Sequence, residues 1–394
     1  MAGIPGIMHI YHPKRTLPLF VYTPNNKSTS PTPNILLFIG GMWDALTATP
    51  YVTTLANYLS SSSSSSSSAS PKWTVIHPLL SSSARQFGIS SLDEDVEEIA
   101  SAISYIRSTP ALGTPASRIV LMGHSTGCQD VLHYITAPTA HNNRASRPLI
   151  QGAILQAPVS DRDSILNAIA KGAAERDAAD ECNRIAAATP AGEHSATLLP
   201  FHATRPFFRT VPVLISRWLS LASPSSPDQP ADDDKFSFDL PPAVLARTFG
   251  QLAGPPLQPL PHPSSASLLV LMSGADECVA PGVDQAVLLA RWKGVVDEAS
   301  GSAELNPASG LVAGAKHNLA GDLFAQRWAR QVDLPERVMT YLDEVVAGRS
   351  SDANGVAGRG VGKEAWELWR REKEALEREK EREDVAAAAA GLKL

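Results

Sequence analysis

The segment from Gly123 to Gly127 has the pattern G-x-S-x-G, and the residues around it restrict the folds that can contain it. The apolar run 118–122 before it is rich in β-branched residues and predicts a strand, and residues 128–135 after it predict a helix. A serine at a sharp strand-to-helix turn has strained backbone and an exposed hydroxyl, which is typical of a nucleophile elbow. The five letters alone also fit an ordinary turn with a capping serine. The flanking elements therefore make Ser125 a candidate nucleophile.

Length and composition predict a large globular protein and exclude several classes of function. The chain has 394 residues, 43% of them hydrophobic, which is enough for one large core with an insertion or for two domains. A net charge of -6, without a basic patch that carries aromatic residues, argues against a nucleic-acid partner. The apolar runs are shorter than the ~20 residues of a membrane span, and the N-terminus does not resemble a signal peptide.

The chain has three cysteines, Cys128, Cys182 and Cys278, which is an odd and sparse set. This set argues against a disulfide framework and is typical of a reducing compartment. We therefore expect a cytoplasmic protein. Cys128 and Cys278 can lie near the site, and we expect both to be small buried residues that fill space.

Strand-like and helix-like segments alternate along most of the chain. Helices are expected at 47–59, 92–106, 128–135 and 334–346. Repeated βα units predict an α/β fold with a doubly wound, mostly parallel sheet that is covered by helices on both faces. The expected strands are 19–23 (an early edge strand), 34–39, 73–77, 118–122, 149–155, 267–272 and 310–313.

The alternation stops between 161 and 265, where Ala-rich helical pieces precede Pro-rich and Ser-rich segments. An insertion of this kind between two strands predicts a cap. The serine run 60–68 predicts a surface loop, and the Glu/Lys/Arg-rich tail predicts an exposed helix, or one that binds a protein partner through Trp366 and Trp369. The expected division is a first core part at 1–160, the cap at 161–265, a second core part at 266–348, and a linker with a charged helical tail at 349–394.

A serine hydroxyl becomes a good nucleophile only when a base takes its proton, and a carboxylate usually orients that base. In doubly wound hydrolases the chain order is serine, acid, histidine. Asp276 follows the strand 267–272 and His317 follows the strand 310–313, at the strand ends where catalytic groups gather. We therefore expect Asp276 as the acid and His317 as the base. Glu277 and Asp161 remain alternatives for the acid.

A tetrahedral oxyanion needs fixed N–H donors. We expect one donor to be the N–H of Thr126 and the other to be the N–H of Met42 or Gly41, in the loop after the strand 34–39. The sequence has no metal-ligand spacing and no G-x-G-x-x-G before a helix, so we expect no metal and no cofactor. The candidate substrate contacts are Trp43, His124, His202, Arg205 and Phe208, with Phe207 and Arg209 beside them.

The motifs resemble those of the α/β-hydrolase fold, and more narrowly those of the fungal DUF1749 family, which includes fusarinine-type siderophore esterases. The resemblance covers residues 8–346 and implies ester hydrolysis, for some members of hydroxamate siderophores inside the cell. The acid loop departs from the family pattern, because Pro281 stands one position later than the family proline. The segments that carry the resemblance are 38–41, 123–130, 156–162, 273–277 and the pair His317-Asn318.

These residues together predict a serine esterase that acts on a small-molecule ester. Two alternatives stay open from the sequence. One is a non-catalytic scaffold of the same fold that binds a ligand or a partner. The other is an acyltransferase or a lactonase with the same three catalytic residues.

Overall fold

The structure, a computed structural model, describes residues 3–23, 34–61, 73–137, 144–259, 266–299 and 303–347, with residues 378, 379 and 382. One mixed sheet runs through it in the order β1-β2-β4-β3-β5-β6-β7-β8, with β9 beside β7. All pairings from β3 onward are parallel, and only β1–β2 and β2–β4 are antiparallel. The predicted mostly parallel sheet is therefore confirmed. The strands are β1 (Gly6–His12), β2 (Leu17–Tyr22), β3 (Asn34–Ile39), β4 (Trp73–Pro78), β5 (Arg118–His124), β6 (Gly152–Gln156), β7 (Ala266–Ser273), β8 (Ala303–Leu305) and β9 (Gly310–Val312).

Helices cover both faces of the sheet, because successive residues of a buried strand point to opposite faces. In β3, Ile35 and Leu37 pack with α2, α3 and α9 on one face. Leu36 and Phe38 pack with α1 and α11 on the other face. The sheet is thus the middle layer of a three-layer core, as the doubly wound pattern predicts. These helices are α1 (Pro50–Ser61), α2 (Leu92–Ser108), α3 (Gly127–Thr136), α9 (Gln285–Glu298) and α11 (Leu334–Ala347).

The structure differs from the expected strands at both sides of the sheet. The strand expected at the edge, 19–23, is the second strand, since β1 pairs outside it. Most side chains of β1 are exposed, so the segment lacks the alternation that marks a half-buried strand. β8 has only three residues and is too short to give a pattern.

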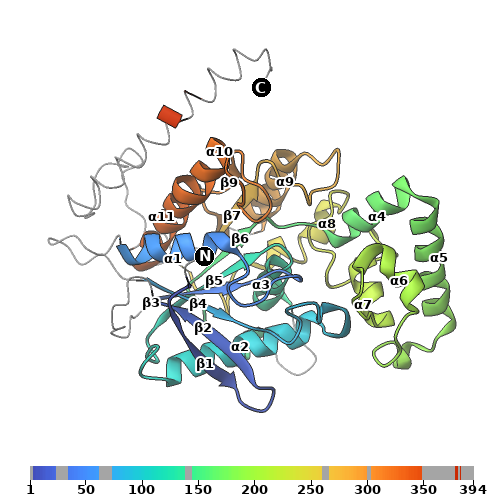
Figure 1. Ribbon diagram of the computed structural model, residues 1–394, viewed down its shortest axis with the longest axis horizontal. Helices are drawn as coiled ribbons and strands as arrows, with labels where there is room; N and C mark the ends of the chain where they lie inside the picture. Colours follow the sequence, from blue (N-terminus) through green and yellow to red (C-terminus); the bar gives the residue numbers. More distant parts are fainter. Residues whose placement is uncertain are drawn as a thin grey trace.

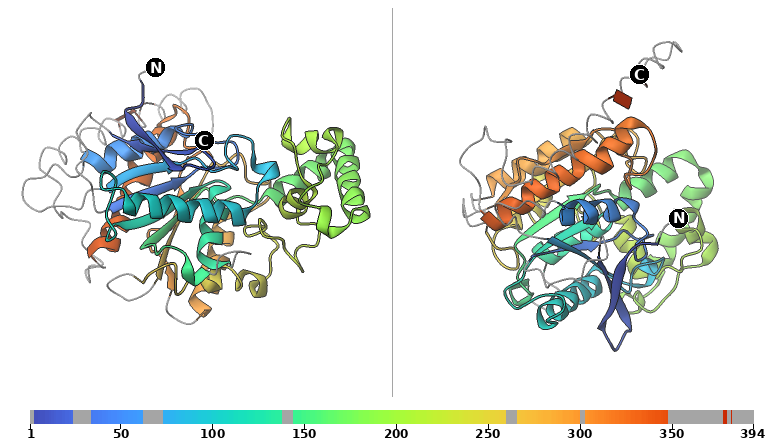
Figure 2. Two further views of the ribbon diagram at one scale, coloured as in Figure 1. Left: turned by 90° about the horizontal axis from the view of Figure 1, so that it is seen from below. Right: turned by 60° about the vertical axis from the view of Figure 1, so that its left-hand side comes forward.

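Four helices form a lobe at one end of the sheet, shown in green in Figures 1 and 2. Trp218 and Cys182 are fully buried in a hydrophobic cluster of this lobe. The later residues 236–257, with α8 (Pro242–Leu245), instead pack in the core, where Phe249 stacks on Trp292 of α9. The segment 161–265 therefore contains a lobe and a core-covering part, and its treatment as one domain remains a prediction. The lobe helices are α4 (Asp161–Lys171), α5 (Ala173–Ala188), α6 (Phe201–Phe208) and α7 (Ile215–Ala222).

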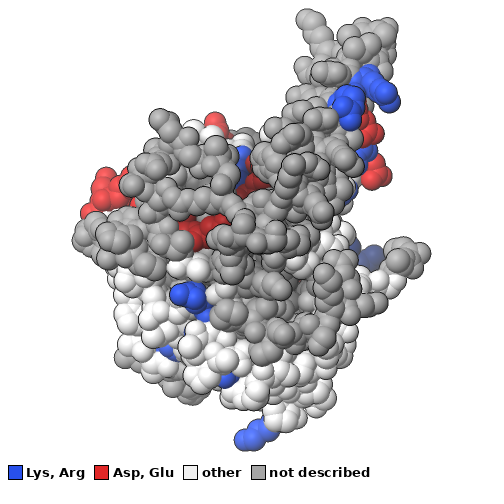
Figure 3. Space-filling model, turned by 90° about the vertical axis from the view of Figure 1, so that its left-hand side faces the viewer, with Lys and Arg blue, Asp and Glu red and all other residues white. Residues whose placement is uncertain are grey.

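Two predicted segments lie largely outside the described residues. Of the serine run 60–68, residues 60 and 61 end α1 and the rest is not described. Of the tail 349–394, only residues 378, 379 and 382 are described. No helix within the described ranges is long and apolar enough to cross a bilayer. Across the rounded body in Figure 3, the described Lys and Arg side chains lie singly among uncharged residues, so this face has no concentration of positive charge in its described part.

Candidate active site

The candidate residues come from loops that follow four parallel strands. Ser125 directly follows β5, and the loop 40–44 follows β3. Asp276 lies three residues after β7, and His317 lies five residues after β9. Since the carboxyl ends of parallel strands meet at one edge of a sheet, these loops converge there.

Ser125 has the strained backbone that the sequence predicts for it. Its φ is +56°, which is uncommon for a residue with a side chain. The glycines on both sides are needed for close backbone approach. A Cβ on Gly123 would lie 2.3 Å from the Gly127 carbonyl oxygen, and a Cβ on Gly127 would lie 2.4 Å from the Ile39 carbonyl oxygen. The G-x-S-x-G pattern is therefore a steric requirement of this turn.

Three predicted side chains form a continuous hydrogen-bonded chain. The Nε2 atom of His317 lies 2.8 Å from Oγ of Ser125. Its Nδ1 atom lies 2.9 and 3.0 Å from the two carboxylate oxygens of Asp276. With its proton on Nδ1, the ring donates to Asp276 and accepts the Ser125 hydroxyl proton at Nε2. This arrangement can activate the hydroxyl as a nucleophile.

The two other candidate acids contact different groups. Oε2 of Glu277 accepts the backbone N–H of His317 at 3.0 Å, which positions the loop but does not touch the ring. Oδ2 of Asp161 accepts an N–H of the Gln129 side chain at 2.8 Å. Among the three carboxylates that the sequence offers, Asp276 is the one bonded to the imidazole.

The environment of His317 changes its basicity in two opposing ways. Burial lowers its pKa, but the hydrogen bond and the negative charge of Asp276, with a further contribution from the Cys278 side chain, outweigh this effect and raise the pKa above 6.5. The neighbouring His124 and His77 have Asp44 as a nearby carboxylate, 3.9 Å from Nε2 of His124, but burial outweighs its effect and lowers the pKa of each to about 4. His317 is thus the basic histidine of this group.

The loop after β3 contacts the serine turn directly. The N–H of Met42 donates to Oγ1 of Thr126 at 2.6 Å, and the N–H of Gly41 donates to Oδ2 of Asp44 at 2.8 Å. A Cβ on Gly41 would lie 2.8 Å from Cβ of Ser125. The two candidate donors of the loop therefore lie next to the serine, and in this state each binds a side-chain oxygen. The Thr126 hydroxyl is a contact that the sequence did not indicate.

The candidate substrate contacts divide into two groups. Trp43 is 42% exposed, packs edge-on against Phe87, and lies under the guanidinium of Arg209 at 5.5 Å. Phe208 is buried behind it against Phe87. His202 and Arg205 are exposed on α6, and neither is hydrogen-bonded to Ser125, Asp276 or His317.

His124 is buried and does not face the solvent. Only 3% of it is exposed, its Nδ1 lies 2.5 Å from Oε1 of Gln156, and its ring is 5.1 Å from that of His317. Its place behind the site fits a role in positioning His317 better than the substrate contact expected from the sequence.

A buried polar network joins the serine helix to the lobe. Arg217 of α7 donates to the Phe87 carbonyl at 2.7 Å and forms an ion pair with Asp233. The Gln129 side chain of α3 donates to the Asp233 carbonyl at 2.9 Å as well as to Asp161. No local pattern predicts this network, because the acidic run 232–234 has the composition of an exposed loop. Its members hold the lobe against α3, the helix that follows the serine.

Cys278 is exposed, so its expected role as a buried residue is wrong, whereas Cys128 is buried as expected. The thiol of Cys278, the carboxylate of Asp276 and a ring nitrogen of His317 all lie within 4.8 Å of one another. The acid loop turns sharply at this point, since the N–H of Cys278 donates to Oδ1 of Asp276 at 2.8 Å. This short turn brings the thiol to the surface of the site.

Comparisons with known proteins agree with the resemblance in the motifs. A family model described as "Protein of unknown function (DUF1749)" matches residues 1–343. The chain is similar to fusarinine C esterase sidJ of Aspergillus fumigatus, with 36% identity over 367 residues that cover 88% of this chain and 97% of that protein. It is also similar to esterase AN6793 of Emericella nidulans, with 33% identity over 370 residues that cover 86% and 93%. Among solved structures, siderophore hydrolase EstB from Aspergillus fumigatus superposes with a TM-score of 0.68 at 35% identity, covering 88% of this chain and 99% of that one.

Proposed function

This chain belongs to the DUF1749 family, and we propose that it is a serine esterase in which Ser125 attacks the ester carbonyl. The observation that carries the proposal is the chain of hydrogen bonds from Ser125 through His317 to Asp276, at 2.8 and 2.9 Å. Two relatives that span most of this chain are named esterases, which supports the same chemistry.

The proposed reaction has two halves that use the same groups. Ser125 Oγ bonds to the carbonyl carbon while its proton moves to Nε2 of His317. The tetrahedral intermediate collapses, and the protonated His317 gives its proton to the leaving alcohol. Water then attacks the acyl-enzyme with His317 again as the base, which releases the acid and restores the serine. Asp276 stabilises the imidazolium that forms in each half and keeps the ring in the productive tautomer.

The oxyanion is proposed to bind the N–H of Thr126 together with that of Met42 or Gly41. The Met42 N–H donates to the Thr126 hydroxyl in the free protein, at 2.6 Å. An oxyanion is a stronger acceptor than a hydroxyl, so it takes over this N–H as charge develops on the carbonyl oxygen. The Thr126 hydroxyl therefore keeps the Met42 N–H in position until the oxyanion forms.

For the substrate, we propose an ester of a hydroxamate siderophore of the fusarinine type. The names of two similar proteins, fusarinine C esterase sidJ and siderophore hydrolase EstB, support this class. The exposed face of Trp43, in the loop 40–44 that supplies an oxyanion donor, and the Arg209 guanidinium 5.5 Å from its ring centre are proposed to contact the bound ester.

Hydrolysis of fusarinine C, both iron-loaded and iron-free, beside p-nitrophenyl butyrate tests the substrate class. We expect ester cleavage of at least one siderophore form, seen by mass spectrometry as release of linear and monomeric hydroxamates. Cleavage of p-nitrophenyl butyrate alone would remove the siderophore assignment and leave the serine mechanism. Cleavage of none of these esters would contradict the proposed function itself.

A methyl group on Gly41 is expected to impair catalysis without unfolding the protein. In Gly41→Ala the new Cβ would meet Cβ of Ser125 at 2.8 Å and Oγ at 3.2 Å, so the loop and the serine must move apart. A displacement near 1 Å at reacting groups costs about 10²-fold in rate, and we expect a loss of that order in kcat for p-nitrophenyl butyrate.

Gly192→Ala is the matched control, because a Cβ at that position in the lobe meets no atom within 4 Å. It should leave kcat and the melting temperature unchanged. If Gly41→Ala behaved like Gly192→Ala, the proposed place of the loop beside the reacting carbonyl would be wrong.

A further inference from the structure

Cys278 places a thiol beside the Asp276–His317 pair, and no bond that forms or breaks in the proposed reaction involves it. The thiol sulfur, a carboxylate oxygen of Asp276 and a ring nitrogen of His317 lie within 4.8 Å of one another. The side chain of Asp276 is only 1% exposed and that of His317 13%, whereas Cys278 is exposed to solvent. The thiol is therefore the solvent-exposed member of this group of three donors, and the other two are largely buried.

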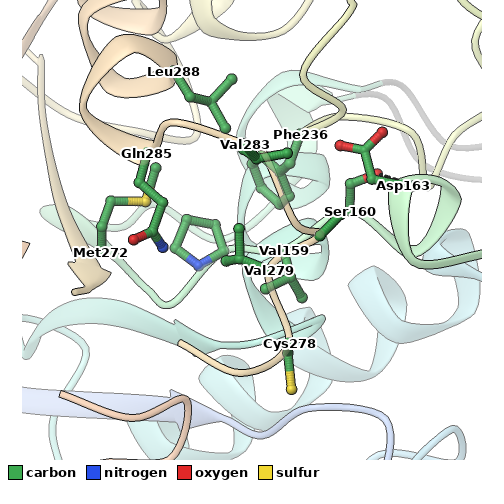
Figure 4. A pocket seen from close by; sticks show the side chains of 12 residues that line it. Val159, Ser160, Asp163, Phe236, Met272, Cys278, Val279, Val283, Gln285 and Leu288 are labelled. Carbon is green, nitrogen blue, oxygen red and sulfur yellow. Dashed lines mark hydrogen bonds between the residues drawn. The ribbon is translucent and has the colours of Figure 1, made fainter. Parts of the chain in front are cut away.

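The thiol does not serve the packing of the neighbouring pocket. Cys278 is among the residues that line a pocket between β7, α9 and the segment 158–163. Figure 4 shows its sulfur pointing away from the apolar side chains of that pocket, among them Phe236 and Leu288. The sulfur thus lies on the opposite side of the acid loop from this pocket.

The three side chains are a donor set that suits a thiophilic divalent ion. Thiolate, imidazole and carboxylate are the ligands of Zn²⁺, which is held tetrahedrally at about 2.0 Å from nitrogen or oxygen and about 2.3 Å from sulfur. Ligand atoms of such a site are roughly 3.3 to 3.6 Å apart. Nδ1 of His317 already lies 2.9 Å from Asp276, so closing the site needs only a small opening of this pair and a turn of the exposed thiol.

We propose that Asp276, Cys278 and His317 form an inhibitory site for a thiophilic divalent transition-metal ion, with Zn²⁺ as the representative ion. The fourth position is open to solvent at the exposed thiol, where water completes the tetrahedron. Inhibition, as distinct from binding, rests on the proposed role of His317 as the base.

The mechanism of inhibition follows from the two ring nitrogens. The ion binds the Nδ1 lone pair and the thiolate, and the thiol proton leaves to solvent. The ring proton then sits on Nε2, which faces Oγ of Ser125 at 2.8 Å. A protonated Nε2 donates to the hydroxyl and cannot accept its proton, so the nucleophile is no longer activated. The ion also occupies the carboxylate that orients the ring.

The proposal is tested by measuring inhibition of ester hydrolysis by buffered free Zn²⁺ in wild type and in Cys278→Ser. Mg²⁺ is the control ion. Cys182→Ala is the control for loss of a thiol elsewhere in the protein. We expect Zn²⁺ to inhibit wild type and Cys182→Ala at micromolar free concentration, and EDTA to restore activity. Half inhibition of Cys278→Ser, measured relative to the activity of that variant without Zn²⁺, should need at least a tenfold higher free Zn²⁺ concentration. Mg²⁺, which prefers oxygen ligands, should have no effect. Equal sensitivity of wild type and Cys278→Ser to Zn²⁺ would overturn the proposal.

A spectroscopic measurement tests the site without any hydrolysis. Co²⁺ bound to a thiolate gives a sulfur-to-metal charge-transfer band in the near ultraviolet, which we expect in wild type and not in Cys278→Ser. A band in a protein that hydrolyses no ester would support the metal site while contradicting the proposed function. An active enzyme without the band and without inhibition by Zn²⁺ would overturn the metal site alone.

Discussion

Replacing Ser125 by alanine is expected to lower kcat for ester hydrolysis by about 10⁴- to 10⁶-fold, because the only atom removed is the proposed nucleophile. Its Oγ lies 2.8 Å from Nε2 of His317, so no other hydroxyl needs to be invoked as the proton donor to that nitrogen. The remaining activity would come from substrate binding and from the oxyanion donors, which the substitution leaves in place. Steady-state hydrolysis of p-nitrophenyl butyrate measures the effect.

The same variant should remain folded. Alanine keeps the Cβ that the turn already accommodates at φ +56°, and the missing hydroxyl lies at a partly exposed position. We expect the melting temperature to change by less than about 2 °C. Ser104→Ala on the exposed side of α2 is the matched control and should retain wild-type activity, since its hydroxyl only bonds to the Ala100 carbonyl. Residual activity above about 1% of wild type in Ser125→Ala would show that another group carries the reaction.

Replacing Asp276 by asparagine is expected to be the second most damaging change, with a loss of about 10³- to 10⁴-fold in kcat. The carboxylate accepts the Nδ1 proton of His317 at 2.9 Å. An asparagine amide can donate to Nδ1 and hold the ring in the opposite tautomer, with its proton directed at Ser125. It also removes the charge that stabilises the imidazolium during the reaction.

Glu277→Gln and Asp161→Asn are the matched controls, because each removes one of the other candidate carboxylates. A glutamine oxygen at position 277 can still accept the His317 backbone N–H, which Glu277 binds at 3.0 Å. Asp161 contacts Gln129 and not the imidazole. We expect both controls to keep kcat within about tenfold of wild type. A larger loss in Glu277→Gln than in Asp276→Asn would show that Asp276 is not the carboxylate that supports the base.

The pH dependence gives a second readout of the same substitution. Only neutral His317 can accept the serine proton, so kcat/KM falls as the pH drops through the pKa of this histidine. Burial lowers that pKa, but the hydrogen bond and charge of Asp276 raise it above 6.5, and we expect the acid limb of wild type above pH 6.5. Asp276→Asn removes the hydrogen bond and charge of Asp276, which raise the pKa most, and leaves burial and the contribution of Cys278, so the acid limb of its residual activity should move to lower pH. A limb that stayed in place would mean that Asp276 does not act through His317.

The sequence predicts the repeated strand and helix units of the fold. It does not predict the elements whose hydrophobic pattern is weak. Buried strands such as β3 are continuous apolar runs with clear ends, so their bounds are predictable. The exposed edge strand β1 has no such pattern, and it lies outside the strand expected at the edge. The order of serine, acid and histidine was readable because each follows a strand that ends at the same edge of the sheet.

Contacts made by residues distant in sequence were not readable in the same way. Arg217 and Asp233 look like exposed charges, and they are buried together only because α7 packs against the segment 87–89 and Asp233 folds onto it. His124 stands in the motif beside the serine, but the pleat turns its side chain under the site, where Gln156 binds it. Cys278 is exposed because the acid loop turns within two residues of Asp276. Each of these depends on packing that local patterns do not encode.

The most direct test of the proposed mechanism is covalent labelling with a fluorophosphonate, followed by intact-mass measurement and peptide mapping. Such a probe reacts with a serine only when a base activates it. We expect one adduct per chain, on Ser125, with hydrolysis of p-nitrophenyl butyrate lost in proportion to labelling, and no adduct in Ser125→Ala or His317→Ala. Loss of hydrolysis with the adduct on another residue, or full hydrolysis by a protein that is labelled at Ser125, would contradict the account.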